Sequence, residues 1–219
     1  PKLLVEDLLD IVASHLGLKS PDKLLFGLAF IDSNDQYNWL QPQRRVLDHE
    51  FPCKAYIAES TLSLYHMVKF YVDSVTHLRY PSTAELFFLQ AKANLYKGTL
   101  SCDSCHLVKL SAHALQAYYG NYVDEKTTVS LLNKTPSLAA QALKNEITWM
   151  NQVIDCYKTI ASMSRGEAIV CYMNLVENLP VYGVHMFEVE DKSGHSWRLG
   201  LCRKGIFQYD MKDVNRPRR

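Results

Sequence analysis

The sequence has little glycine and almost no net charge. It contains 9 glycines in 219 residues, and its 24 Lys and Arg residues nearly balance 23 Asp and Glu residues, for a formal net charge of +1 at pH 7. No phosphate-binding loop, dinucleotide-binding glycine motif, kinase signature or nucleophile elbow is present. A nearly neutral chain has no overall attraction to nucleic acid or to an anionic membrane, so such binding would need a local patch.

Long apolar runs and sequence repeats are also missing. The longest apolar stretches, such as 24–31, are far shorter than the roughly 20 residues that a membrane-spanning helix needs. No secretory signal peptide is visible, although a chain that begins at Pro1 need not include its natural start. With 47% hydrophobic and 21% charged residues, the chain has the composition to bury a substantial core. Its length predicts one or two domains of ordinary size.

Six cysteines are spread along the chain without the spacing of a disulfide framework. Four of them lie among apolar residues, as reduced core cysteines do; these are Cys105, Cys156, Cys171 and Cys202. This pattern favours a reducing, cytosolic compartment.

Cys102, Cys105 and His106 form a C-x-x-C-H pattern, which occurs at haem attachment sites and in low-pKa thiol pairs at helix N-termini. The chain offers no companion ligands with the spacing of a zinc site. We interpret the segment as the start of a helix that Ser101 or Asp103 caps, with Cys105 facing the core. No haem, metal or other cofactor is expected.

The hydrophobic period changes near the C-terminal end of the chain. Apolar residues within 168–179 recur every three or four positions, which predicts a helix that ends before Pro180. Three runs then alternate in polarity and predict an antiparallel sheet; they are 181–189, 196–201 and 205–210.

The first part of the chain also mixes the two periods. An amphipathic helix is predicted at 3–16, and strand-like runs follow at 24–31, 37–40 and 62–70. The pattern from 71 to 179 is helical, including a helix that opens at Pro81. The sequence therefore predicts an α+β fold in which a helical region separates two regions that contain strands.

The motifs around the helix-to-sheet junction resemble those of the FERM domain, the three-lobed module of band 4.1, ezrin, radixin and moesin. The third lobe of that family has a Tyr-Gly-Val turn, an acidic-Lys-x-Gly hairpin and a Trp-Leu-Gly strand. Here they read 182–184, 190–194 and 197–200, with Arg198 interposed in the last motif. The middle-lobe sequence Leu-Phe-Phe-Leu-Gln-Ala-Lys stands at 86–92. The resemblance covers essentially the whole chain and is strongest to the junctional scaffold proteins that bind cytohesins and Par-3.

The resemblance implies a three-lobed FERM fold. A partial ubiquitin-like lobe would occupy 1–70, and an all-helical lobe like acyl-CoA-binding protein would occupy 71–180. The first strands of a PH/PTB-like lobe would occupy 181–219. It also implies a segment that lacks the N-terminal hairpin of the first lobe and the C-terminal part of the third lobe, where the family's peptide groove lies.

The function that this resemblance implies is that of a non-catalytic adaptor. Such a scaffold links plasma-membrane or junctional proteins to the cortical cytoskeleton, at the cytoplasmic face of the plasma membrane and at cell junctions. The implied partners are membrane-protein tails, cytohesin-type exchange factors and polarity proteins, and no nucleic acid. Two alternatives are open: a targeting module of a larger tyrosine phosphatase or kinase, and binding of an acyl-CoA-like ligand by the helical lobe.

Arg44 and Arg45 are the candidate binding residues. In ezrin-type FERM domains this part of the first lobe carries basic residues that hold an inositol phosphate head group, together with a lysine of the third lobe. Guanidinium groups suit phosphate oxygens because they donate two parallel hydrogen bonds. Gln41 and Gln43 stand where the family often has lysine and asparagine, which weakens the pocket. The resemblance implies phosphoinositide contact by Arg44 and Arg45, and the alternative is a solvated basic loop.

Overall fold

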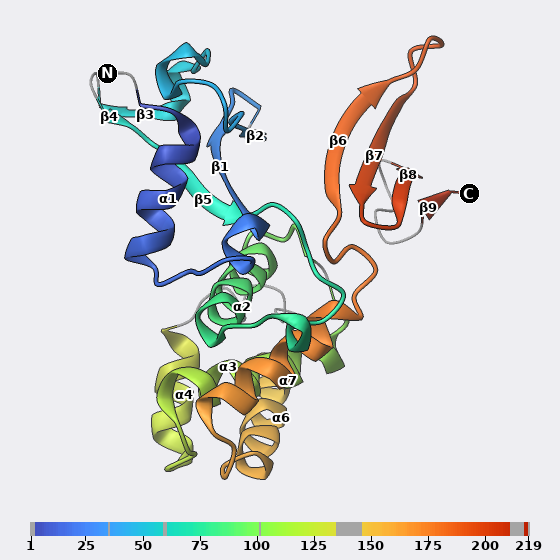
Figure 1. Cartoon of the computed structure of the whole chain (residues 1–219). Coiled ribbons are helices and arrows are strands. Elements are labelled where there is room, and N and C mark those ends of the chain that lie inside the picture. Colours follow the sequence, from blue (N-terminus) through green and yellow to red (C-terminus); the bar gives the residue numbers. More distant parts are fainter. Residues whose placement is uncertain are drawn as a thin grey trace. The chain divides into compact units, whose positions relative to one another are not determined.

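The computed structural model describes residues 3–34, 36–58, 61–100, 102–134, 146–210 and 217–218 (Figure 1). The chain divides into two compact units, the first formed by 1–71 and 78–86 and the second by 72–77 and 87–219. The described elements confirm the predicted α+β fold class. The limits of the three lobes, 1–70, 71–180 and 181–219, stay a prediction. No helix in the described ranges has the length and apolar character that crossing a membrane requires.

The first unit is a helix packed against a small antiparallel sheet. Helix α1 spans Val5–His15, and the sheet has the strand order β2-β1-β5. Its strands are β1 (Phe26–Ile31), β2 (Tyr37–Trp39) and β5 (Tyr65–Val68). Short elements fill the connections: η1 (Asp22–Leu25), η2 (Val46–Asp48), η3 (Cys53–Ala55), β3 (Tyr56–Ala58) and β4 (Thr61–Leu62). The buried core between them contains Val5, Leu28, Leu40 and Val46.

All three predicted strands of this unit are longer than the observed ones, although the strand predicted at 37–40 exceeds β2 by one residue only. Residues 24 and 25 belong to η1, so the strand predicted at 24–31 begins at Phe26. The cause is Asp22, a buried carboxylate that accepts hydrogen bonds from the backbone N–H groups of Arg79 (2.9 Å) and Tyr80 (3.2 Å). Of the run predicted at 62–70, residue 62 ends the short strand β4, and Tyr65–Val68 form β5.

His66 lies on the core side of this sheet, where its ring stacks on Phe26 with 5.0 Å between centroids and 13° between planes. Burial lowers the pKa of this imidazole below its ordinary value of 6.5, because the charged form loses hydration inside the protein. The folded protein therefore holds His66 neutral at a pH where the unfolded chain has begun to bind a proton.

This difference predicts that the free energy of unfolding falls as the pH decreases below about 6.5. Replacing His66 with Phe keeps the stacking and removes the titrating group, so the variant should lose less stability between pH 7 and pH 5.5 in urea titrations. Half-buried His113, whose pKa is also lowered, gives the unfolding free energy of both proteins some further dependence on pH. Equal slopes for the two proteins would contradict the assignment.

The second unit is built around α3 (Ser104–Tyr119), which packs against α6 (Glu146–Thr159) and α7 (Arg165–Glu177). The other described elements before its sheet are η4 (Val75–His77), the greater part of α2 (Pro81–Tyr96) and α4 (Glu125–Asn133). Phe88 of α2 meets Tyr172 of α7 edge to face at 4.8 Å. Residues 135–145 of the predicted helical stretch lie outside the described residues.

Side-chain caps fix where these helices begin. The carboxylate of Asp103 accepts the backbone N–H of His106 at the start of α3, which confirms one of the two predicted caps, while Ser101 lies outside the described residues. Ser164 and Glu167 form a reciprocal capping box at the start of α7. Such caps satisfy N–H groups that have no partner within the helix.

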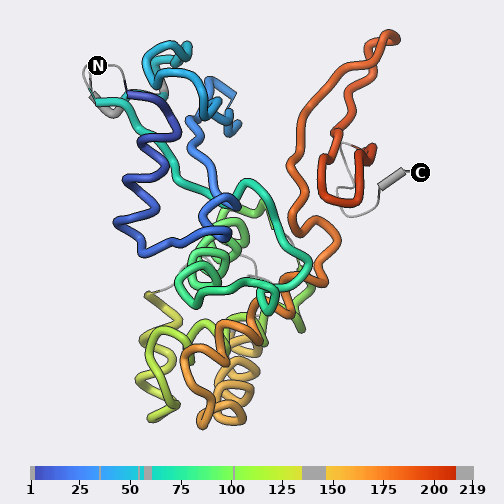
Figure 2. The backbone as a smooth tube through the Cα atoms, viewed as in Figure 1, coloured from blue at the N-terminus to red at the C-terminus, as the bar shows by residue number. Residues whose placement is uncertain are grey.

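The sheet of the second unit has the order β6-β7-β8-β9, and all pairs are antiparallel. Its strands are β6 (His185–Glu190), β7 (Ser196–Cys202), β8 (Gly205–Tyr209) and β9 (Pro217–Arg218), and Figure 2 shows the first three following one another along the chain. The strand predicted at 181–189 begins only at His185. Residues 181–184 form a turn in which Gly183 has φ 69°, a conformation that favours glycine.

Glu177 at the end of α7 holds the segment that contains η4. Its carboxylate Oε1 accepts the backbone N–H of Val75 at 2.6 Å, and burial raises the pKa of Glu177. In the same segment, Asp73 forms an ion pair with Arg203 at 2.7 Å. Both contacts lie within the second unit.

We expect Glu177→Ala to lower the free energy of unfolding by about 1 to 2 kcal/mol, because the Val75 N–H loses a charged acceptor in a half-buried place. Glu177→Gln keeps an oxygen acceptor of the same length and is the matched control, for which a smaller loss is expected. Urea unfolding of both variants measures the difference. If the Ala variant is as stable as the Gln variant, the hydrogen bond does not hold this segment.

Candidate functional site

The candidate site is the loop 41–50, which joins β2 to the following part of the first unit. Its backbone is bonded to the chain around the start of α1: the N–H groups of Val5 and Glu6 donate to the carbonyls of Arg44 and Pro42, both at 3.0 Å. The N–H of Val46 donates in return to the carbonyl of Leu3 at 3.1 Å. The first N–H groups of a helix have no partner within it, so the loop supplies acceptors that α1 needs.

Val46 anchors the loop to the core. Its side chain is buried and belongs to the cluster that also contains Val5, Leu28 and Leu40. The adjacent residues on either side, Arg45 and Leu47, are exposed. The short helix η2 therefore turns one side chain inward and leaves its neighbours in contact with solvent.

His49 closes the loop from within. Its Nε2 accepts the backbone N–H of Gln41 at 3.0 Å, and its Nδ1 lies 3.0 Å from the carbonyl oxygen of Arg45 and 3.2 Å from that of Val46. Because a backbone N–H can only donate, Nε2 is the acceptor, and the proton of the neutral ring is on Nδ1. One imidazole thus bonds three backbone groups of the loop that carries both arginines.

The two arginines differ in whether their guanidinium groups are hydrogen-bonded within the protein. The guanidinium of Arg44 donates to the carbonyl oxygen of Asp48 at 2.6 Å, which directs this side chain along the loop. In the described part of the chain no hydrogen bond or ion pair engages the guanidinium of Arg45. Arg45 is therefore the more available of the two for an external anion.

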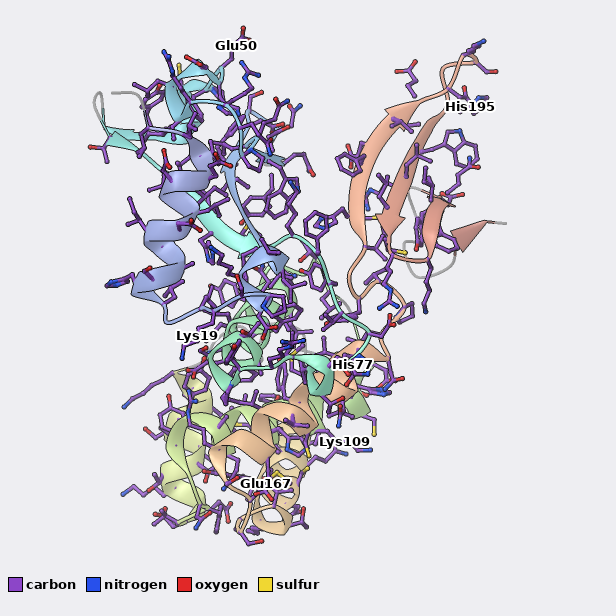
Figure 3. The ribbon with its side chains drawn as sticks, viewed as in Figure 1. Lys19, Glu50, His77, Lys109, Glu167 and His195 are labelled. Atoms are coloured by element: carbon purple, nitrogen blue, oxygen red, sulfur yellow. The ribbon has the colours of Figure 1, made fainter. Side chains whose placement is uncertain are left out.

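Two carboxylates in the loop offset the arginine charge. Asp48 and Glu50 are both exposed, and Figure 3 shows Glu50 at the margin of the first unit. With Arg44 and Arg45, they bring the formal charge of the segment 41–50 to zero when His49 is neutral. The electrostatic attraction of this loop to a distant anionic surface is accordingly weak.

The C-x-x-C-H segment lacks the properties of a reactive thiol pair. Burial and the neighbouring Asp103 raise the pKa of the Cys102 thiol to about 11, so it is protonated at neutral pH. Cys105 is exposed, so its predicted core position is wrong. His106 Nδ1 lies 2.8 Å from Oδ2 of Asp103. No group of three or more His, Cys, Asp or Glu residues within the described ranges is placed to hold a metal ion.

Sequence reasoning found Arg44 and Arg45 and missed His49. A histidine that bonds only to backbone groups leaves no pattern in the sequence, because its partners are not side chains. Leu47 left a visible signal, an apolar residue two positions after a basic pair.

We predict that His49→Phe lowers the free energy of unfolding by about 1 to 2 kcal/mol, because the new ring keeps the volume and loses the bonds to three backbone groups. His15→Phe, at an exposed position in the last turn of α1, makes the same chemical change outside the loop and should cost less than about 0.5 kcal/mol. Urea unfolding followed by circular dichroism distinguishes the two. Equal stabilities would show that His49 does not hold the loop.

Comparison with known families and proteins gives consistent matches along the chain. The model of the FERM N-terminal domain matches residues 1–50, and that of the FERM central domain matches residues 73–187. Human Merlin is 27% identical over 97% of this chain, and band 4.1-like protein 1 of Rattus norvegicus is 29% identical over 95%. Human tyrosine-protein phosphatase non-receptor type 13 is 27% identical over 96%. The chain spans 35%, 22% and 9% of the lengths of these three relatives.

Solved structures show the same fold. A crystal structure of the FERM and C-terminal domain complex of Drosophila Merlin covers 100% of this chain with a TM-score of 0.84 and 24% identity, and the chain covers 73% of it. The human myosin 7b C-terminal MyTH4-FERM domain, in complex with the harmonin-a PDZ3 domain, matches 99% of the chain with a TM-score of 0.69 and 17% identity. The chain covers 47% of that structure.

Proposed function

Because the chain belongs to the FERM domain family, we propose that it is a non-catalytic adaptor module that connects membrane proteins to the cortical cytoskeleton. The support is a family match over the N-terminal and central domains together with a FERM fold along the whole chain. A MyTH4-FERM domain of myosin 7b forms a complex with a PDZ domain of another protein, which illustrates the use of such a module in protein binding.

A more specific proposal concerns the binding partners of the intact protein and its location in the cell. We propose that the intact protein binds membrane-protein tails, cytohesin-type exchange factors and polarity proteins at the plasma membrane and at cell junctions. The motifs at 182–184 and 190–194 resemble those of the FERM third lobe, and the resemblance of the chain to junctional scaffold proteins supports this choice. In the structure, Asp191 orders this hairpin by accepting the N–H groups of Ser193 and His195 and the indole N–H of Trp197.

At the membrane, we propose that Arg44 and Arg45 contact the head group of a phosphoinositide. The single observation that carries this proposal is the exposed guanidinium of Arg45 on a loop that His49 and the start of α1 already hold in place. A preformed loop loses little conformational entropy when it binds, so even one or two phosphate contacts add to affinity. Arg44 contributes a second positive charge beside it while its guanidinium remains on the Asp48 carbonyl.

The test is the double substitution Arg44→Glu and Arg45→Glu in a vesicle-sedimentation assay with phosphatidylcholine vesicles that contain phosphatidylinositol bisphosphate. Charge reversal at a phosphate contact should weaken binding at least tenfold, because charge-assisted hydrogen bonds of about 1.5 to 3 kcal/mol each become repulsive. The melting temperature should fall only slightly, because both side chains are exposed and the one bond that is lost, from Arg44 to the Asp48 carbonyl, lies at the surface.

The matched control is the double substitution Lys126→Glu and Lys134→Glu. It changes the net charge by the same amount at exposed positions at the two ends of α4, outside the loop. Retained binding by this control separates a local site from an overall charge effect. Equal losses in the two double variants, or no loss in the arginine variant, would contradict the lipid site.

A second candidate function is that of a targeting module within a larger tyrosine phosphatase. One observation favours it: a tyrosine-protein phosphatase is among the relatives that match 95% or more of this chain. A phosphatase domain elsewhere in the intact protein, together with hydrolysis of a phosphotyrosine substrate by that protein, would establish this candidate. The acyl-CoA-like ligand of the helical lobe stays a prediction.

A further inference from the structure

Leu47 is the most exposed apolar side chain of the candidate loop. Its side chain is 64% exposed, while that of Val46, one residue earlier, is 8% exposed. The turn of η2 produces this contrast, because it places Val46 in the core and points the next residue away from it. Single exposed leucines are common on protein surfaces, so exposure alone indicates no function.

The loop cannot easily bury Leu47 by rearranging. His49 bonds to the carbonyls of Arg45 and Val46 on one side of this residue, and Arg44 bonds to the carbonyl of Asp48 on the other. Val46 N–H is bonded to Leu3 as well. The backbone on both sides of Leu47 is therefore fixed, and the side chain stays in solvent unless another molecule covers it.

The proposed lipid contact of Arg45 indicates what kind of molecule covers Leu47. Arg45 is exposed, but Asp48 and Glu50 offset the two arginines, so long-range attraction to an anionic bilayer is small. Stable attachment of a peripheral protein to a membrane requires two contributions, one electrostatic and one apolar. Leu47 lies two residues after Arg45, so the same loop exposes one cationic and one apolar side chain.

We infer that Leu47 is an apolar membrane anchor that inserts into the boundary between head groups and acyl chains of an anionic bilayer while Arg45 contacts a phosphoinositide head group. This inference rests on the proposed lipid contact and adds to it. The ligand of the loop is then an intact bilayer. A free inositol phosphate has no apolar phase into which Leu47 could insert. The loop then contacts both the charged head groups and the apolar interior of the membrane.

The matched pair of variants is Leu47→Ser and Leu24→Ser. Leu24 lies in η1, is 66% exposed and has the same side chain, so it controls for the loss of an exposed leucine elsewhere in the first unit. On phosphatidylcholine vesicles with phosphatidylinositol bisphosphate, Leu47→Ser should bind about tenfold more weakly, which corresponds to the loss of one partly inserted leucine. Leu24→Ser should bind as the unmodified protein does.

Binding of soluble inositol trisphosphate distinguishes a lipid head group within a bilayer from a free inositol phosphate. Leu47→Ser should leave that affinity unchanged within twofold, whereas the arginine double variant should lose it. If Leu47→Ser binds vesicles normally while the arginine variant does not, the anchor is wrong and the lipid contact stands. If neither variant affects vesicle binding, both proposals are wrong.

A tryptophan variant tests the insertion of residue 47 even if the serine substitution unfolds the loop. Leu47→Trp places an indole at the proposed depth, and its fluorescence should shift to the blue on vesicles and be quenched by brominated acyl chains. The chain's own tryptophans are controlled for by the unsubstituted protein. Fluorescence that does not change on vesicles to which the variant binds would overturn the insertion.

Discussion

The backbone pairing between the start of α1 and the loop 41–50 is the constraint on which the rest of the site depends. Val5 and Glu6 donate to carbonyls of the loop, and Val46 donates back to Leu3. This exchange satisfies N–H groups that α1 itself leaves unpaired, so the same bonds that begin the helix also position the arginines. Val46 adds a buried apolar contact to this pairing. The site is therefore bonded to the start of α1 and packed on the core of the first unit, although it is carried by a loop.

Some side chains of the loop hold its structure, and others are exposed for the proposed binding. His49 and the Arg44 guanidinium bond to backbone carbonyls and so fix its shape. Arg45 and Leu47 are exposed, and we propose that they supply the charge and the apolar surface for a membrane. Because the acidic residues of the loop cancel its charge, specificity rests on short-range contacts rather than on long-range attraction. A module that connects membrane proteins to the cytoskeleton would then recognise the membrane locally, at a place where partners also gather.

The sequence predicted those features that arise from neighbouring residues. The Asp103 cap follows from local chemistry. Arg198 was noted only as a departure from the motif, and the structure pairs it across the strands with Glu188 at 3.0 Å. Features that depend on distant partners were not predictable. Asp22 shortens a strand because it binds N–H groups 57 and 58 residues away, and His49 acts on backbone groups that no sequence pattern shows. The candidate arginines were identified by resemblance, but only the structure showed that one of them is already engaged by the protein.

Amide hydrogen exchange resolved by residue tests the central claim most directly, with the protein free and bound to vesicles that contain phosphatidylinositol bisphosphate. A preformed loop predicts slow exchange in the free protein for the N–H groups of Gln41, Val5 and Val46, which are bonded within this pairing. On vesicles, added protection should concentrate at residues 44–48. Exchange of these three amides in the free protein at the rate of an unstructured chain would contradict the account, as would protection on vesicles that spares this loop.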